Sequence, residues 1–272
     1  MVIPIVIPAR NEEKRLAATL ESIDAMADYA NVEVLKIVVS DGSKDQTSAI
    51  AKKAGCVVID LPDRGYSALA KPELANTHNA GFEYIINHIA DYEYLMVIGA
   101  DSSFEKNYLT ILLQQMQKNK NLVMAAGVID GLLTAKNAVR GTGRIIKRNF
   151  WVEMGAKLPS NFYSWESYPV IYALSLGYET QTIYEAIMYT SRNPMENTDW
   201  KRYGIGMKEQ GCILPYVLLR AAKGIFSGQV KNSFRLIIGF LFSHPNLYPE
   251  KQRKYVTRYQ KKQIKKFVFR IK

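Results

Sequence analysis

Residues 94–105 read YLMVIGADSSFE, and this stretch decides the fold class because an apolar run passes directly into polar side chains. Tyr94–Ile98 has the continuous apolar character of a buried strand, and Asp101, Ser102 and Ser103 follow within five residues of it. In parallel sheets flanked by helices, ligands bind beyond the carboxyl ends of the strands. The stretch is therefore either an ordinary strand-to-loop turn or a sheet edge that needs hard oxygen ligands.

Two earlier stretches repeat this arrangement of an apolar run followed by polar residues. Val2–Ile7 precedes the polar segment ARNEE, and Val34–Val39 precedes SDGSKD. Other segments alternate with them: helices are expected over Arg15–Ala27 and Asp45–Lys53 and up to Tyr84–Ile89, and a strand over Cys56–Ile59. Short alternation of strands and helices predicts an α/β fold with a mostly parallel sheet and helices on both faces.

The charge of the 272-residue chain divides it into two regions. Residues 1–200 hold 19 Lys and Arg against 23 Asp and Glu, a net charge of −4, and residues 201–272 hold 17 against 2, a net charge of +15, which together give +11. We therefore expect a catalytic domain over 1–200 and a basic, amphipathic helical region over 201–272. A block of positive charge typically meets a polyanion, either an anionic membrane or nucleic acid.

Two apolar segments lie inside this basic region. Ile213–Phe226 and Phe234–Phe242 are interrupted by Arg220, Lys223 and Arg235 and fall short of the roughly 20 apolar residues that a membrane span needs. They could lie in a membrane interface with their cations at the headgroups, or pack against the catalytic domain as ordinary core.

The cysteines, histidines and N-terminus exclude some classes of protein. The two cysteines, Cys56 and Cys212, lie far apart and are expected to be reduced thiols, and the three histidines are scattered, which argues against a zinc site. The N-terminus has no basic residue before an apolar stretch, so no signal peptide is expected. We expect a cytoplasmic protein that is peripheral to the membrane.

Several motifs in order over residues 1–190 resemble family 2 glycosyltransferases of the GT-A fold. The matching pieces are Ile7–Glu13, Val39–Asp45, Arg64-Gly65 with Asn79–Gly81, Gly99–Ser103, Gly143–Gly155, and Trp165-Glu166-Ser167 ahead of Gly177. Each piece alone is a weak signal, whereas their shared order is a strong one. The resemblance implies a nucleoside-diphosphate sugar, UDP- or GDP-linked, as the donor.

The resemblance also implies roles for the residues at the first two strand ends. Glu12 and Asp41 would hydrogen-bond the base and ribose, in a slot lined by Pro8, Ala9 and Arg10. The residues themselves leave another interpretation open, in which Glu12 begins a helix and Asp41-Gly42 is a turn.

At the third strand end the resemblance implies a metal site for Mn²⁺ or Mg²⁺. The family uses Asp-x-Asp, and here Ser103 replaces the second aspartate. We expect Asp101 as the principal ligand with Ser103 or Glu105 assisting, and Ser102 beside the nucleotide sugar. Alternatively, Ser102 and Ser103 cap a helix expected over Lys106–Gln117.

A base and phosphate-binding cations complete the expected site. Glu166 falls where the family places the base that takes the proton from an acceptor hydroxyl; otherwise it is a surface glutamate at a helix start, or only orients groups if the acceptor is a phosphate. Arg64, Lys71 and Arg202 are expected to contact phosphate.

These expectations describe a metal-dependent inverting hexosyltransferase with a lipid-linked or saccharide acceptor at the cytoplasmic face of an anionic membrane. A catalytically impaired nucleotide-sugar-binding protein of the same fold is one alternative. A nucleic-acid binder is another, with tail aromatics that could stack on bases: Tyr248, Tyr255, Tyr259 and Phe267. No nucleic-acid partner is expected, because no recognised nucleic-acid-binding module is present. A dinucleotide-binding dehydrogenase is poorly supported, because no G-x-G-x-x-G follows the first strand.

Overall fold

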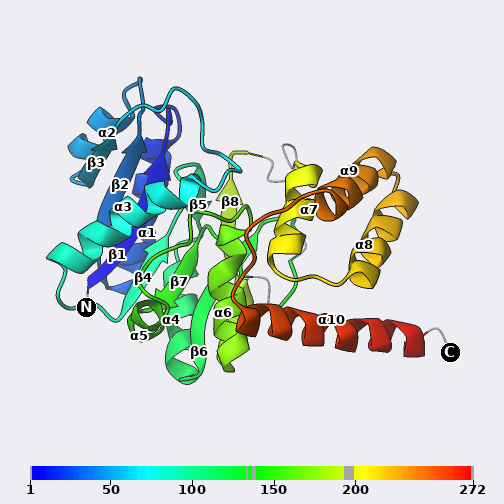
Figure 1. The fold of residues 1–272 in the computed structure, drawn as a ribbon. Coiled ribbons are helices and arrows are strands. Elements are labelled where there is room, and N and C mark those ends of the chain that lie inside the picture. The colour runs from blue at the N-terminus through cyan, green and yellow to red at the C-terminus, as the bar shows by residue number, and fades with distance from the viewer. Residues whose placement is uncertain (1, 133, 137–138, 193–198, 271–272) are drawn as a thin grey trace.

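The computed structural model describes residues 2–132, 134–136, 139–192 and 199–270, and it contains an eight-stranded sheet with helices on both faces (Figure 1). The strands are Val2–Ala9 (β1), Glu33–Asp41 (β2), Val57–Leu61 (β3), Tyr94–Val97 (β4), Ser102–Phe104 (β5), Leu122–Ile129 (β6), Arg144–Lys147 (β7) and Glu179–Thr190 (β8). Their order is β3-β2-β1-β4-β7-β6-β8-β5. The pairs β3–β2, β2–β1, β1–β4 and β6–β8 are parallel, and β7 and β5 run antiparallel to their neighbours. The expected mostly parallel α/β fold is confirmed.

Helices cover both faces of this sheet because its central strands are apolar on both sides. On one face pack Leu16–Ala30 (α1), Thr47–Lys53 (α2) and Tyr108–Lys118 (α4), and on the other Leu74–His88 (α3), Arg148–Glu153 (α5) and Tyr168–Leu176 (α6). In β1, Ile3 and Ile5 point to the first face and Val6 to the second, all fully buried. Each such side chain stabilises the fold by about 1.5–3 kcal/mol.

Two predicted boundaries differ at the functional edge of the sheet. Ser40 and Asp41 belong to β2 and do not follow it. The alternative interpretation, in which Ser102 and Ser103 cap the helix that became α4, is wrong, because both residues lie in β5, where the segment Ser102–Phe104 pairs with Met188–Thr190. Asn107 precedes α4 instead and makes no side-chain cap hydrogen bond.

The C-terminal region is helical, as expected, and begins as a packed group of three helices. These are Trp200–Glu209 (α7), Leu214–Phe226 (α8) and Val230–Leu241 (α9), followed by Glu250–Arg270 (α10). Helices α7 and α9 approach closely because Gly204 and Gly239 have no side chain; a Cβ on Gly204 would lie 2.1 Å from the Leu236 carbonyl oxygen. Within the described residues, no helix combines the length and apolar character that crossing a bilayer requires.

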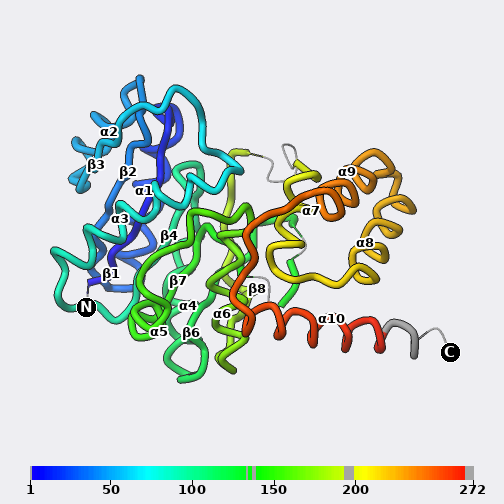
Figure 2. The backbone as a smooth tube through the Cα atoms, viewed as in Figure 1, coloured from blue at the N-terminus to red at the C-terminus, as the bar shows by residue number. Residues whose placement is uncertain are grey.

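The chain returns to the sheet between α9 and α10, as Figure 2 shows. Tyr248 in this segment is fully buried in the core cluster on the α3 side, and its hydroxyl donates to the Ser164 carbonyl oxygen at 2.6 Å. Its ring is therefore inaccessible to a nucleic-acid base, and the side chain of Phe267 lies outside the described residues. Tyr255 and Tyr259 stack on each other, with ring centroids 6.3 Å apart.

A buried carboxylate also fastens the C-terminal helices to the sheet part. Glu209, at the end of α7, accepts hydrogen bonds from the backbone amides of Tyr163 and Ser164, both at 2.9 Å, and from the Ser164 hydroxyl at 2.6 Å. Ser164 immediately precedes the 3-10 turn Trp165–Ser167 (η1). The division into a catalytic domain and a C-terminal region at residue 200 stays a prediction, and these bonds join its two sides.

Candidate active site

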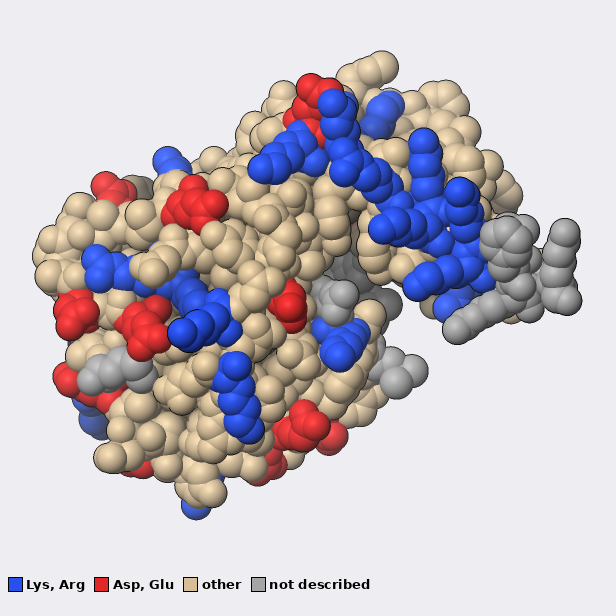
Figure 3. Space-filling model, turned by 90° about the horizontal axis from the view of Figure 1, so that it is seen from below, with Lys and Arg blue, Asp and Glu red and all other residues tan. Residues whose placement is uncertain are grey.

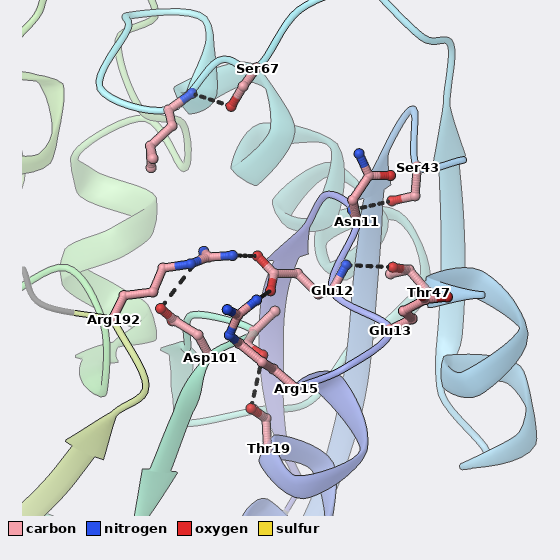
Figure 4. A network of polar contacts seen from close by, with 12 residues as sticks. Asn11, Glu12, Glu13, Arg15, Thr19, Ser43, Thr47, Ser67, Asp101 and Arg192 are labelled. Carbon is pink, nitrogen blue, oxygen red and sulfur yellow. Dashed lines mark hydrogen bonds and ion pairs between the residues drawn. The ribbon is translucent and has the colours of Figure 1, made fainter. Parts of the chain in front are cut away.

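The loops after β1 and β2 are locked together, which fixes the position of Glu12. Asn11 has a left-handed backbone (φ 54°), a conformation that asparagine tolerates better than most residues. Its side-chain oxygen accepts a hydrogen bond from the Lys44 backbone amide at 2.9 Å, and its backbone amide donates to the Ser43 hydroxyl at 3.1 Å. The Glu12 amide donates to the Thr47 hydroxyl at 2.8 Å (Figure 4). The two strand ends thus form one rigid rim.

Arg192 bridges two of the predicted site carboxylates (Figure 4). Its guanidinium forms an ion pair with the buried Glu12 and lies 3.7 Å from an Asp101 carboxylate oxygen. Arg15 lies 3.4 Å from the other Glu12 oxygen. The ends of β1, β4 and β8 are therefore joined through one side chain. The sequence interpretation missed Arg192 because it expected no strand over Glu179–Thr190, the strand β8 that this residue follows.

The predicted residues around Asp41 also come together. Arg64 forms an ion pair with the buried Asp41 carboxylate, and Arg10 donates to the Asp41 backbone carbonyl. The other Arg10 nitrogen lies 2.8 Å from Asp63, and hydrogen bonds from Arg10 and then Lys44 hold the pKa of Asp63 well below its usual range. Pro8 and Ala9 form the end of β1, paired with Val39 and Ser40 of β2.

At the end of β4, Asp101 faces the β8 end of the sheet. Its carboxylate accepts from the Thr190 hydroxyl at 3.3 Å, and its backbone carbonyl from the Ser191 amide at 3.1 Å. The Ser102 hydroxyl lies 3.1 Å from that of Thr142. These contacts leave the Asp101 carboxylate between Thr190 and the Arg192 guanidinium.

The other two predicted metal ligands have different partners. Ser103 pairs with Tyr189 across β5 and β8, and Glu105 accepts from the Tyr189 hydroxyl at 2.5 Å. That hydrogen bond raises the pKa of Tyr189. The described residues contain no group of three or more His, Cys, Asp or Glu side chains that could hold a metal ion. A magnesium-type cation needs only one or two carboxylates when substrate phosphates complete its shell, so Asp101 alone fits such a site.

Glu166 lies in η1 and is exposed, held by one backbone contact. The Gly141 amide donates to its carboxylate at 2.7 Å, and a Cβ on Gly141 would lie 2.2 Å from that oxygen. The next residue, Thr142, accepts from the Gly99 amide at 2.9 Å. Beneath them, burial lowers the pKa of Arg144 to about 10, and its guanidinium lies 3.2 Å from the Glu166 carbonyl. The 141–142 segment therefore connects Glu166 with the Asp101 strand end.

Lys71 and Arg202 contact other groups in the structure. The Lys71 ammonium lies 3.8 Å above the Tyr66 ring. Arg202 donates to the Ala70 carbonyl at 3.3 Å and lies 3.3 Å from Asp199. Both residues thus lie where the loop before α3 meets α7, and their role in phosphate binding stays a prediction.

Comparison with known sequences places this chain among sugar transferases. The sequence model described as Glycosyl transferase family 2 matches residues 5–152. A 59-residue segment is 46% identical to the 4,4'-diaponeurosporenoate glycosyltransferase of Staphylococcus aureus; the match covers 22% of this chain and only 15% of that protein.

Solved structures share the fold at low sequence identity. The mannosyltransferase PcManGT from Pyrobaculum calidifontis, solved with GDP-Man and Mn²⁺, gives a TM-score of 0.60 at 14% identity over 86% of this chain and 69% of its own. Residues 1–349 of S. aureus TarS, solved with UDP, give 0.58 at 16% identity over 89% and 71%.

Proposed function

The chain belongs to glycosyl transferase family 2, and from that premise we propose that it transfers a hexose from a UDP- or GDP-linked sugar to an acceptor. The observation that carries this proposal is the ion-pair bridge from Glu12 through Arg192 to Asp101. The bridge brings the Glu12 carboxylate, proposed to bind the nucleotide, close to the Arg192 guanidinium, proposed to bind the diphosphate. Both lie at the carboxyl edge of the sheet, where α/β sheets bind their ligands.

In this proposal the donor replaces the arginine side chains that are now paired with Glu12 and Asp41. Glu12 and Asp41 accept hydrogen bonds from base N–H and ribose hydroxyl groups, in a slot lined by Pro8, Ala9 and Arg10. The guanidinium groups now paired with these carboxylates, Arg64 and Arg192, then turn toward the diphosphate, whose oxygens they can bind in bidentate fashion. The rigid rim around Asn11 keeps both carboxylates in place during the exchange.

A divalent cation, Mn²⁺ or Mg²⁺, is proposed to bind at Asp101, with assistance from Ser103 of β5 or from Glu105, which follows that strand. When bound, such a cation offsets the charge that builds on the departing diphosphate. The Mn²⁺ in the PcManGT structure supports this proposal. The Asp101 carboxylate becomes accessible to a cation once the Arg192 guanidinium, 3.7 Å away, has turned aside.

Glu166 is proposed as the base. Its exposed carboxylate can take the proton of an acceptor hydroxyl as the sugar transfers with inversion, and the Gly141 amide fixes its direction. If the acceptor is a phosphate, no proton needs to be removed and Glu166 only orients groups.

We further propose that the acceptor is lipid-linked and that transfer occurs at the cytoplasmic face of an anionic membrane. The support is the +15 charge of residues 201–272. The staphylococcal relative is named for glycosylation of 4,4'-diaponeurosporenoate, and a saccharide acceptor is the other candidate.

Thermal shift with a panel of UDP- and GDP-sugars, with and without Mn²⁺, tests the donor site. We expect one donor to raise the Tm of the wild type and of the exposed control Asp91→Asn, and Asp41→Asn and Arg192→Ala to lose most of that shift. No stabilisation by any nucleotide sugar would overturn the proposal. Stabilisation without release of nucleotide in any acceptor mixture would favour the impaired binding protein instead.

A further inference from the structure

The hairpin of α8 and α9 buries one side and exposes another. Val217 and Ala221 of α8 and Leu236 and Phe240 of α9 are buried, three of them in a small cluster with Met207 of α7. Three phenylalanines of the same hairpin are largely uncovered: Phe226 is 91% exposed, Phe242 76% and Phe234 57%. The interpretation of these segments as core therefore holds for one side of the helices, and the interpretation as a membrane interface concerns their exposed side.

Within each helix of the hairpin, exposed apolar residues recur on one side. In α9, Val230, Phe234, Ile238 and Leu241 are exposed and recur at intervals of four and three, which places them on one side of the helix. Another side of α9 lies against α7, where a Cβ on Gly239 would be 2.0 Å from the Lys201 carbonyl. In α8, Leu214, Leu218 and Ile225 are exposed at intervals of four and seven, which also places them on one side of the helix. We call these residues, with Phe226 and Phe242, the outer hairpin face.

The positive charge around the outer hairpin face favours an anionic partner. Residues 210–249 contain no Asp or Glu. Of the hairpin cations, Arg235 pairs with Asp199 at 3.2 Å and Arg220 lies over the Tyr203 ring, and Lys223 and Lys231 are exposed. A second copy of this chain would bring the same cations and be repelled, whereas an anionic lipid surface complements them. Figure 3 shows that Lys and Arg also gather on the side of the molecule that carries α10, while acidic side chains are spread over the sheet part.

We propose that the outer hairpin face inserts into the interface of an anionic lipid bilayer. Phe226, Phe234 and Phe242 enter the boundary between headgroups and acyl chains, and Lys223 and Lys231 lie at the level of the lipid phosphates. The helix ends stay in the interface, since the described helices are too short or too polar to span the bilayer. The proposal deepens the membrane location proposed above, but lipid binding needs neither donor nor transfer.

Vesicle flotation of the full chain tests the face directly. With phosphatidylcholine vesicles that contain phosphatidylglycerol, we expect Phe226→Ser/Phe234→Ser/Phe242→Ser to weaken binding by at least about 100-fold. The matched control is Tyr29→Ser/Ile86→Ser/Val152→Ser, which removes three apolar side chains of the sheet part that are 52–61% exposed and should bind as the wild type does. Equal loss in both variants, or in neither, would overturn the proposal.

The charges are tested separately. Lys223→Gln/Lys231→Gln should weaken binding to anionic vesicles by about tenfold or more, and the wild type should bind neutral phosphatidylcholine vesicles weakly. Lys53→Gln/Lys118→Gln removes two exposed lysines of the sheet part and should change little. Binding that is indifferent to phosphatidylglycerol would contradict the anionic partner.

Two further measurements separate this inference from its rivals. The tryptophan emission of Phe234→Trp should shift to the blue with anionic vesicles, and that of Ile86→Trp should not. If the wild type is instead a dimer by light scattering, and the triple Phe variant a monomer, the face is a self-interface and the proposal fails. The donor-induced Tm shift of the triple variant should equal that of the wild type, so that loss of docking and loss of the donor site are distinguished.

Discussion

The sheet edge and the outer hairpin face differ in whether their charged side chains have partners of opposite charge within the chain. At the sheet edge, Glu12, Asp41 and Asp101 each face an arginine of the same chain, supplied from a distant element. On the hairpin, cations and large apolar side chains lie together and the sequence supplies no acidic residue over 40 positions, 210–249. The carboxylates of the edge are therefore paired within the chain until a ligand replaces a partner. On the hairpin, Arg235 alone has an acidic partner among the described residues, Asp199, and the other cations are open to a partner from outside the chain.

Removing the carboxylate of Asp101 should break the sheet edge as a functional site. We expect Asp101→Asn to lower sugar transfer by about 100- to 1,000-fold, because the charge on the departing diphosphate loses its counterpart. Asp91→Asn is the matched control, since that carboxylate is exposed and precedes β4, away from the carboxyl edge of the sheet, and it should leave the rate nearly unchanged. Steady-state rates with a labelled donor measure both, and equal losses would contradict the role of Asp101.

Adding one methyl group next to Glu166 should reduce turnover without touching the donor. In Gly141→Ala the new Cβ would lie 2.2 Å from the Glu166 carboxylate, so we expect kcat to fall by about 100-fold with unchanged nucleotide affinity. Combining it with Glu166→Gln should cost no more than Glu166→Gln alone if both act through the same group. A weakened donor affinity in Gly141→Ala would show that it acts elsewhere.

Breaking the joint between the two regions should show how far they fold as one. Glu209→Ala removes a buried carboxylate and leaves the backbone amides of Tyr163 and Ser164 without their acceptor, and we expect it to lower the free energy of unfolding by about 3 kcal/mol. Urea unfolding measures this against the exposed control Glu185→Ala, which should cost under about 0.5 kcal/mol. A separate early transition for the C-terminal helices in Glu209→Ala would sharpen the boundary between the regions.

The smallest expected effect concerns the pH dependence of the edge. Arg10 and Lys44 hold the pKa of Asp63 below its usual value of 3.8, so the folded state favours the carboxylate and its stabilisation is present above that pH. We expect Asp63→Asn to have a slightly lower Tm than the wild type at neutral pH. The difference should shrink as the pH falls below 3.8, and a difference that does not vary with pH would refute this origin.

Local sequence pattern predicts the fold class and much of the first two strand ends. The runs Val2–Ile7 and Val34–Val39 are each followed by polar residues, and neighbouring parallel strands must end at the same edge. The pairing of strands that are neighbours in the sequence is therefore enough to predict that Glu12, Asp41 and Arg64 lie together at this edge of the sheet.

Features that depend on distant pairing could not be predicted in this way. Ser102–Phe104 is a strand only because β8, some 85 residues later, lies beside it. Arg192 reaches Glu12 across 180 residues through the same strand. The motif residues Asn79 and Gly81 have packing roles: the Asn79 amide bonds both backbone groups of Leu158, and Gly81 lets α3 approach Val6.

The adjacent residues Gly141 and Thr142 hold the Glu166 side chain at a fixed separation from the strand end at Asp101. One holds the carboxylate of Glu166 through its amide, and the hydroxyl of the other holds Gly99 and Ser102 beside Asp101. A trans peptide unit keeps its two Cα atoms about 3.8 Å apart, and it does not stretch. The rigid peptide between Gly141 and Thr142 therefore helps to fix the distance between the Glu166 carboxylate, which is proposed to receive a proton, and the strand end at Asp101, where the sugar would leave.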